Sequence, residues 1–288
     1  MNKKILMLAC LISMQAIAED IEPGDFTPAP KGTNLLLLYW NHINSDSLKM
    51  NGTEFKDQTN QKVDIGLLRM VHFSEIAGMP FNYQLIVPFG KVDGQIAGND
   101  LKTKETQFGD PMLGFVLWPY NNPKNNSSFG IASITAFPLG HYSQDDRFIS
   151  LGANTWTQDF QFVYTKGLDS GYKFEASFDL YMYGKNDEYG PLNQNFKVEN
   201  SYKTQLWFSK DISPLTNLGL GYSYSTGGDQ KIDGLKNGLN KDIQKVRLSG
   251  SHFFTKTDQL QAEINHGFQN KGGYDQEFGF QLRYLKIF

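Results

Sequence analysis

The chain has 288 residues, with 27 basic and 30 acidic side chains, so its charge is close to balanced. That balance disfavours a dedicated nucleic-acid binder, which would present a basic face. The 22 Phe, 14 Tyr and 28 Gly favour strands and turns over helices.

Residues 1–18 are predicted to be a signal peptide. Lys3 gives a charged start, and the apolar stretch over residues 5–14 is too short to span a membrane as a helix. Small residues at Ala16 and Ala18 predict cleavage after Ala18. A lipoprotein signal at Cys10, the single cysteine, is a weaker alternative because the apolar run continues beyond it. The mature chain would then hold no disulfide and no thiolate nucleophile or metal ligand.

Residues 19–32 are predicted to form a short N-terminal segment in the periplasm. Its prolines, Pro23, Pro28 and Pro30, keep it extended or irregular. As an alternative, the segment enters the interior of the domain that follows it and acts as a partial plug.

From residue 33 to the end, apolar and polar residues alternate with the period of two that is typical of strands. Each predicted strand has 11 to 15 residues, whereas soluble strands usually have about 5 or 6 and a tilted strand that crosses a bilayer needs about 9–11. The lengths therefore predict one all-β domain over residues 33–288, a single antiparallel transmembrane β-barrel of about 12 strands. The predicted strands cover residues 33–45, 63–75, 81–92, 106–118, 128–139, 154–165, 172–184, 200–210, 216–226, 243–254, 258–269 and 274–288.

The connections between these strands alternate in length. Short turns are followed by long polar stretches at 46–62, 93–105, 140–153, 185–199 and 227–242. Outer-membrane barrels have short periplasmic turns and long external loops, so the short turns are predicted to face the periplasm.

The charged face of each strand is expected to point into the lumen. A Lys or Arg that faces lipid at mid-membrane costs about 2–4 kcal/mol. The lining could select a solute, or it could be a network of ion pairs that braces a closed interior. The candidate lining residues are Asp159, Lys173, Glu175, Asp179, Tyr181, Tyr183, Lys203, Lys245, Arg247, Glu263 and Arg283. Around Arg69 the alternation does not settle which side chains face the lumen and which face the lipid.

Three aromatic residues near the expected outer strand ends have two interpretations. Tyr181, Tyr183 and Trp156 could stack on an aromatic solute. Aromatic residues at strand ends more often form the girdle at the membrane interface.

The last predicted strand carries an expected assembly signal. Phe288 ends the chain, and Tyr284, Leu282 and Phe280 alternate back from it. This pattern resembles the signal that the outer-membrane barrel assembly machinery recognises. Lys286 departs from it, since that position is usually apolar or aromatic.

From about Asn34 onward, the sequence resembles an outer-membrane family known as meta-pathway phenol degradation proteins, often called transporters. The matching stretches include Phe108-Gly109-Asp110-Pro111, Trp118-Pro119-Tyr120, Phe137-Pro138-Leu139-Gly140, Leu151-Gly152-Ala153-Asn154, Gly184-Lys185-Asn186-Asp187 and Gly219-Leu220-Gly221-Tyr222. The resemblance implies a barrel and suggests the passage of small compounds, including aromatic ones. It carries over no catalytic residue.

The residues do not predict an enzyme, a metal site or a cofactor. His42, His72, His141, His252 and His266 are scattered without the spacing of a metal site. A lipid hydrolase would need a Ser, a His and an orienting partner on the outer wall, and the serines near His252 lack the frame of a nucleophile motif.

The predicted function is that of an outer-membrane channel for passive uptake of small, aromatic or hydrophobic molecules. Its expected partners are outer-membrane lipid, the assembly machinery and a small solute, with no nucleic acid and no cofactor. A closed barrel with a structural or surface-interaction role is the second hypothesis, and an outer-membrane lipid hydrolase is the third.

Overall fold

The computed structural model describes residues 20–145 and 148–288. The predicted signal peptide therefore lies outside the described residues. None of the helices in the described part of the chain is both long enough and apolar enough to cross a membrane.

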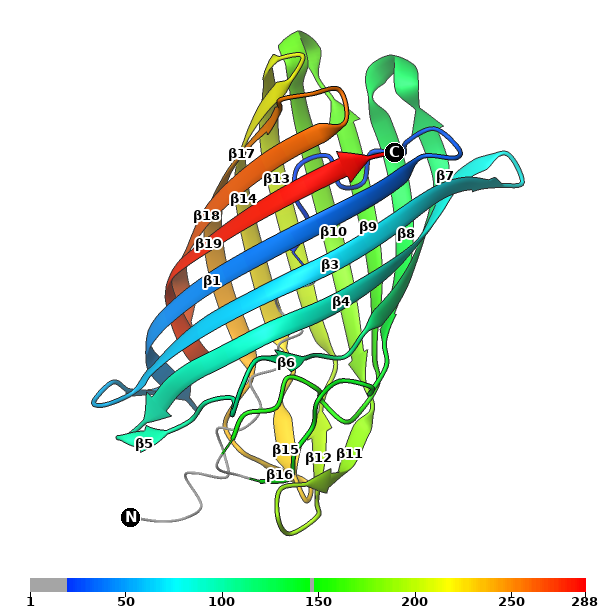
Figure 1. Ribbon diagram of the computed structural model, residues 1–288. Coiled ribbons are helices and arrows are strands. Elements are labelled where there is room, and N and C mark those ends of the chain that lie inside the picture. Colours follow the sequence, from blue (N-terminus) through cyan, green and yellow to red (C-terminus); the bar gives the residue numbers. More distant parts are fainter. Residues whose placement is uncertain (1–19, 146–147) are drawn as a thin grey trace.

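Twelve long antiparallel strands form a closed barrel, in which each strand pairs with its neighbours in chain order (Figure 1). The first and last strands close it, from the Leu35–Ile287 pair to the Lys49–Gly273 pair. The predicted all-β barrel is confirmed. The barrel strands are β1 (Asn34–Met50), β3 (Asn60–Ile76), β4 (Met79–Ile96), β7 (Met112–Asn122), β8 (Ser127–Ala136), β9 (Thr157–Gly167), β10 (Tyr172–Tyr183), β13 (Ser201–Ser213), β14 (Thr216–Gly227), β17 (Lys241–Phe253), β18 (Asp258–Asn270) and β19 (Gly273–Ile287).

The two ends of the barrel differ. Short turns, two of which contain the 3-10 helices η2 (Pro123–Asn125) and η3 (Asp169–Gly171), lie at the end where β1 begins and β19 finishes (Figure 1). The long connections lie at the opposite end, which by the usual orientation of such barrels faces outward from the cell. They contain β2 (Thr53–Phe55), β5 (Asn99–Asp100), β6 (Gln107–Phe108) and a separate four-stranded sheet of β11 (Lys185–Tyr189), β12 (Gln194–Val198), β15 (Gln230–Ile232) and β16 (Leu235–Lys236).

The structure differs from the predicted boundaries at the outer end. Strands β1, β3 and β4 run on through residues expected to be loop, because their polar outer ends keep pairing beyond the apolar alternation. The strand predicted at 106–118 begins only at Met112, and the one predicted at 128–139 ends at Ala136. The residues predicted as strand before Met112 and after Ala136 lie mostly in irregular loops.

The two faces of the wall follow the alternation of the sequence. In β10, Phe178 is 44% exposed on the outside, whereas Asp179 is fully buried on the inside. The pattern recurs in β14, where Leu220 faces outward and Ser223 is buried. Burying charge inside avoids the cost of placing it in lipid.

Candidate functional site

The described N-terminal segment, residues 20–33, lies inside the barrel rather than outside it. Ile21 and Phe26 are about as buried as core residues, and they pack against Trp118, Trp207 and other inward side chains of the wall. This placement is the partial plug that the sequence left as an alternative, and it fills the middle of the lumen.

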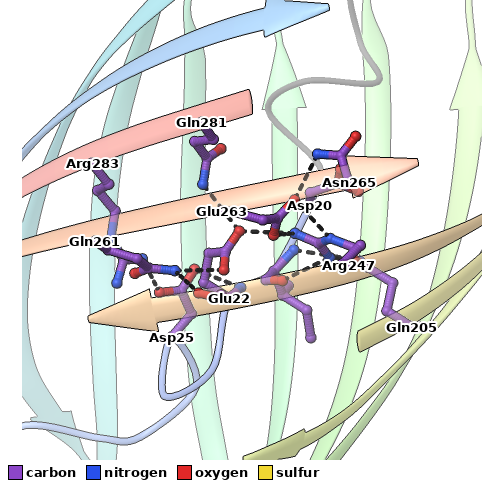
Figure 2. Close-up of polar contacts among 12 residues, drawn as sticks. Asp20, Glu22, Asp25, Gln205, Arg247, Gln261, Glu263, Asn265, Gln281 and Arg283 are labelled. Atoms are coloured by element: carbon purple, nitrogen blue, oxygen red, sulfur yellow. Dashed lines mark hydrogen bonds and ion pairs between the residues drawn. The ribbon is translucent and has the colours of Figure 1, made fainter. Parts of the chain in front are cut away.

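Three acidic side chains of this segment meet cations of the wall. Asp20 pairs with Lys203, and the Glu22 carboxylate lies 2.8 Å from the Arg247 guanidinium. Asp25 lies 2.6 Å from a guanidinium nitrogen of Arg283. Figure 2 shows Glu22 between the side chains that project from β17, β18 and β19. The segment is therefore held by charge as well as by apolar packing.

Glu22 occupies a crowded polar site. Arg247 also donates to Glu263 at 2.6 Å, so two carboxylates share one guanidinium. Gln261 and Gln281 donate to Glu22 at 2.5 and 3.0 Å. Burial and the neighbouring Glu263 raise the pKa of Glu22 well above its ordinary value. This arrangement favours the protonated form of Glu22.

Asp20 has the opposite balance. Burial would raise the pKa of Asp20, but the positive charges of Lys203, Arg247 and Lys245 more than offset burial, so this pKa lies below its usual range. The segment thus combines a carboxylate that stays ionised with one that favours its protonated form.

Main-chain contacts hold the segment as well. Trp207 donates its indole N–H to the Ile21 carbonyl at 2.9 Å, and Trp118 donates to the Phe26 carbonyl at 3.0 Å. The Gly24 amide donates to the carboxylate of Glu175 at 3.1 Å. Because the donors come from β13 and β7 on different parts of the wall, the segment crosses the lumen.

On the side of β1, β3 and β4, the outer half of the lumen, near the long loops, is apolar. Its buried cluster combines inward residues of β1, β3 and β4 with residues of the long connections. The members are Leu48, Val63, Ile65, Leu67, Val92, Ile96, Leu101, Ile149, Leu151 and Leu239. We call this group the outer apolar cluster.

Part of the barrel wall beside this cluster is built from loops. Strand β4 pairs with β7 only from Phe81–Leu117 to Ile86–Met112. Its outer half meets β5, β6 and the chain that connects them. Residues 107–111, 137–141 and 149–154 then continue the wall, and we call them the loop-built wall.

The loop-built wall is joined by a carboxylate and by close backbone contacts. Asp110 accepts hydrogen bonds from the amides of Gly140 and Ala153 at 2.9 and 2.8 Å. A Cβ atom on Gly140 would lie 2.4 Å from the backbone of Gly109, and one on Gly152 would lie 2.8 Å from that of Gly140. Three stretches that carried the family resemblance therefore meet here, although they are far apart in sequence.

A cavity of about 940 Å³ lies between the N-terminal segment and the short turns. Residues Pro23–Asp25 and Thr27–Pro30 of the segment line one side of it. Leu35, Leu37 and Leu285 line the wall of β1 and β19, and Lys173 and Asp211 lie among the polar residues of the lining. We call it the inner cavity.

The structure places the predicted lining residues inside the barrel, nine of them buried and two half-buried. The half-buried ones are Lys173, which pairs with Asp211, and Lys245. The buried ones are Asp159, Glu175, Asp179, Tyr181, Tyr183, Lys203, Arg247, Glu263 and Arg283. Their role in lining a solute path stays a prediction.

The aromatic residues at the outer strand ends divide into two groups. Tyr181 and Tyr183 are 1% and 3% exposed, so they do not belong to a lipid-facing girdle. The hydroxyl of Tyr183 lies 2.6 Å from the hydroxyl of Ser201, and Lys241 donates to the Tyr183 hydroxyl at 3.0 Å. Trp156 is 45% exposed, as a girdle residue would be.

Sequence reasoning missed several contributors to the interior. Asp20, Glu22 and Asp25 were not singled out, although three acidic residues in six positions of a proline-rich segment are a usable signal. Arg69 faces inward, 3.7 Å from Asp25, and resolves the ambiguous parity of β3. Asp110 stands out in the sequence only as part of a family motif.

The contacts of Lys286 explain why a lysine can stand at this usually apolar position of the terminal strand. The ammonium group of Lys286 donates to Asp258 of β18 at 2.9 Å, and the Tyr284 hydroxyl donates to the same carboxylate at 2.7 Å. An outward lysine is therefore neutralised near the short-turn end, where the cost of charge in a membrane falls to about 0–1 kcal/mol. Phe280 and Leu282 alternate outward on the same strand, and Phe288 is 68% exposed.

The geometry around His252 does not form a hydrolase site. Its Nδ1 lies 2.8 Å from the Thr216 hydroxyl. Ser249 is buried on the inner face, whereas His252 is exposed on the outer face of the same strand. No group of three or more His, Cys, Asp or Glu residues within the described ranges could hold a metal ion.

Over residues 45–284 the chain matches the model of the family described as "Putative MetA-pathway of phenol degradation". This match covers most of the chain. The chain belongs to this family. None of the curated proteins compared with it matches in sequence.

Solved structures agree with the family. The COG4313 outer membrane channel from Pseudomonas putida F1 is 28% identical and superposes with a TM-score of 0.88, over 93% of this chain and 100% of that one. The beta domain of the Bordetella autotransporter BrkA (10% identical, TM-score 0.51) is matched over 90% of this chain and 100% of its own. The TodX deltaS2S3 mutant monoaromatic hydrocarbon channel (9%, 0.50) is matched over 90% and 91%. The last two share the fold alone. Membership and the first match place this chain in the outer membrane as a channel-type barrel.

Proposed function

We propose that this protein mediates the passive uptake of small apolar or aromatic molecules across the outer membrane. The observation that carries the proposal is the loop-built wall, which has apolar residues on both of its sides. Outside it, Phe108 is 66% and Leu139 is 76% exposed. On its inner side, Ile149 and Leu151 of this wall, together with the nearby Leu101, belong to the outer apolar cluster. An apolar solute could thus pass from lipid to lumen without crossing a charged surface.

The energetics of the wall support entry from this side. Opening a strand pair in a membrane breaks a ladder of backbone hydrogen bonds, each of which costs several kcal/mol if it is left unsatisfied in lipid. At the loop-built wall, separate backbone hydrogen bonds and the two bonds to Asp110 join the loops instead of a continuous strand ladder. The N-terminal segment, by contrast, fills the middle of the lumen with paired charges.

Names of similar proteins support the solute class. The family description refers to phenol degradation, and the Pseudomonas putida relative is described as an outer membrane channel. The inward residues from Asp159 to Arg283 would then line the path beyond the outer apolar cluster and brace the barrel. Catalysis is not part of the proposal, because His252 and Ser249 lie on opposite faces.

Export and assembly complete the proposal. Residues 1–18 would be removed after Ala18, and Phe280, Leu282, Tyr284 and Phe288 would present the assembly signal. The outward alternation of β19 and its exposed terminal aromatic support the second point.

A disulfide across the loop-built wall tests the route. Phe89 of β4 and Phe108 of β6 are paired, and the Gly109 amide donates to the Pro88 carbonyl beside them. Phe89 and Phe108 are therefore a non-hydrogen-bonded pair, whose Cα atoms lie about 4.5 Å apart and suit a disulfide. If Cys10 leaves with the signal peptide, the double cysteine variant holds no other thiol.

Entry of benzyl alcohol, benzoate and glucose would be measured in proteoliposomes with lipopolysaccharide in the outer leaflet. We expect wild type to admit benzyl alcohol faster than protein-free vesicles, oxidised Phe89→Cys/Phe108→Cys to lose this entry, and reduction to restore it. The control Tyr83→Cys/Phe115→Cys locks a pair that is already in the β4–β7 ladder and should have no effect. Absence of entry through wild type, with heat-modifiable migration showing a folded barrel, would favour the closed-barrel hypothesis.

A further inference from the structure

Two arginines of the wall converge on one carboxylate at the boundary of the inner cavity. Arg283 of β19 donates to Asp25 at 2.6 Å, and Arg69 of β3 lies 3.7 Å from the other oxygen of the same carboxylate. All three residues line the inner cavity. Tyr39, on the strand between them, accepts a hydrogen bond from Arg69 at 3.3 Å and lies under the Arg283 guanidinium.

Arg283 retains binding capacity in this arrangement. Its side chain is 4% exposed, and its buried Nε atom has no hydrogen-bond partner among the residues that the structure describes. Besides the bond to Asp25, its guanidinium donates a hydrogen bond to Gln259, which is long at 3.4 Å. A guanidinium offers five donors in a planar fork that matches a carboxylate. The side chain is thus built into the wall with part of that fork unused.

The carboxylate that joins the two arginines does not belong to the barrel wall. Asp25 lies in the N-terminal segment, which contacts the wall through side chains and single main-chain bonds instead of strand pairing. The wall itself therefore presents two guanidinium groups at this point, and a chain segment supplies the anion.

The surface next to the arginines is apolar. Toward the short turns, the same three strands line the cavity with Leu35, Leu37, Val71, Phe73, Leu285 and Ile287. A cavity of about 940 Å³ has room for a small aromatic or alkyl body beside the Asp25 carboxylate. The lining thus pairs a carboxylate-binding fork with an apolar surface.

We propose that the inner cavity is a binding site for amphiphilic carboxylates, whose carboxylate binds Arg283 and Arg69 and whose apolar body lies on β1, β3 and β19. In this site Asp25 is the internal competitor of the ligand. The inference rests on the proposed uptake function and specifies a solute class for it.

The test is isothermal titration of the protein in lipid nanodiscs, with empty discs subtracted. The probes are 4-phenylbutyrate, 4-phenylbutanol and 4-phenylbutylamine, which share one body, and acetate, which lacks it. We expect 4-phenylbutyrate to bind at least tenfold more tightly than each of the others.

Two substitutions should move the affinity in opposite directions. Arg283→Gln should weaken 4-phenylbutyrate binding about tenfold, as loss of a charge-assisted hydrogen bond does, and Arg283→Lys should restore part of it. Asp25→Asn should strengthen binding because it removes the competing charge. Lys210→Gln is the matched control, since Lys210 faces outward over the Tyr172 ring at the same end of the barrel.

Equal affinity for the carboxylate and the alcohol, or weaker binding in Asp25→Asn, would overturn the inference. Tight binding of acetate would show a site for small anions alone and would overturn it too. Because binding is measured without flux, a failure of uptake in proteoliposomes leaves this result standing, and the two proposals are distinguishable.

Discussion

Replacing Asp110 by alanine should loosen the loop-built wall and leave the strands intact. The carboxylate joins two loops through the amides of Gly140 and Ala153, at 2.9 and 2.8 Å. A hydrogen bond to a charged group contributes about 1.5–3 kcal/mol. Since Asp110 is only half-buried and water can replace part of these contacts, we expect a total of about 2–4 kcal/mol. That range corresponds to roughly 30- to 700-fold in the equilibrium between closed and open loops.

Two measurements check this expectation. Hydrogen exchange at the amides of Gly140 and Ala153 should accelerate by that factor, while exchange in β10 stays slow. Entry of benzyl alcohol into proteoliposomes should rise until opening no longer limits it. Asp187→Ala is the control, because Asp187 is 67% exposed and pairs only with Lys185 among the contacts of the described chain. Unchanged hydrogen exchange in Asp110→Ala would refute the role of Asp110 in joining the loops. Faster exchange with unchanged entry of benzyl alcohol would refute entry through the loop-built wall.

Three further predictions concern the wall and the segment. Gly140→Ala should open the same wall, since its Cβ would lie 2.4 Å from the Gly109 backbone and overpacking costs about 1–3 kcal/mol; faster exchange at Ala153 checks it. Arg247→Ala should lower the free energy of unfolding by about 3–5 kcal/mol, because it leaves Glu22 and Glu263 buried without their cation, and urea unfolding in detergent measures this loss. The raised pKa of Glu22 means that the folded state holds a proton which the unfolded state releases, so this residue's contribution to stability falls as pH rises above about 4.5. In a plot of the urea midpoint against pH, Glu22→Gln should reduce the slope above about pH 4.5. An unchanged slope would contradict the assignment of this pH dependence to Glu22.

Much of the barrel could be predicted because a strand in lipid has few alternatives. The alternation in residues 173–183 is complete, and β10 has the predicted faces and nearly the predicted ends. The prediction fell short where polar strand ends leave the membrane, as in β1 and β3, since pairing there no longer depends on apolar alternation.

The site was less accessible to sequence reasoning. Alternation identified the inward charges of the later strands, such as Arg247 and Glu263, because each is flanked by outward apolar residues. It could not show which of them face the N-terminal segment, since those contacts join residues more than 150 positions apart. The loop-built wall was equally hidden, because Asp110, Gly140 and Ala153 have no periodicity and meet only through tertiary structure.

The position of the N-terminal segment also bears on the order of folding. The segment leads directly into Asn34, whose backbone exchanges hydrogen bonds with Phe288 at the junction of the first and last strands. While that junction is open, the segment can reach the interior sideways. Once β1 and β19 have paired along the junction, the segment can enter only through the opening at the short-turn end. The closure of the barrel and the entry of the segment thus take place at the same site. A misfolded state in which β1 and β19 have paired but the segment has not entered the interior is therefore an expected kinetic trap.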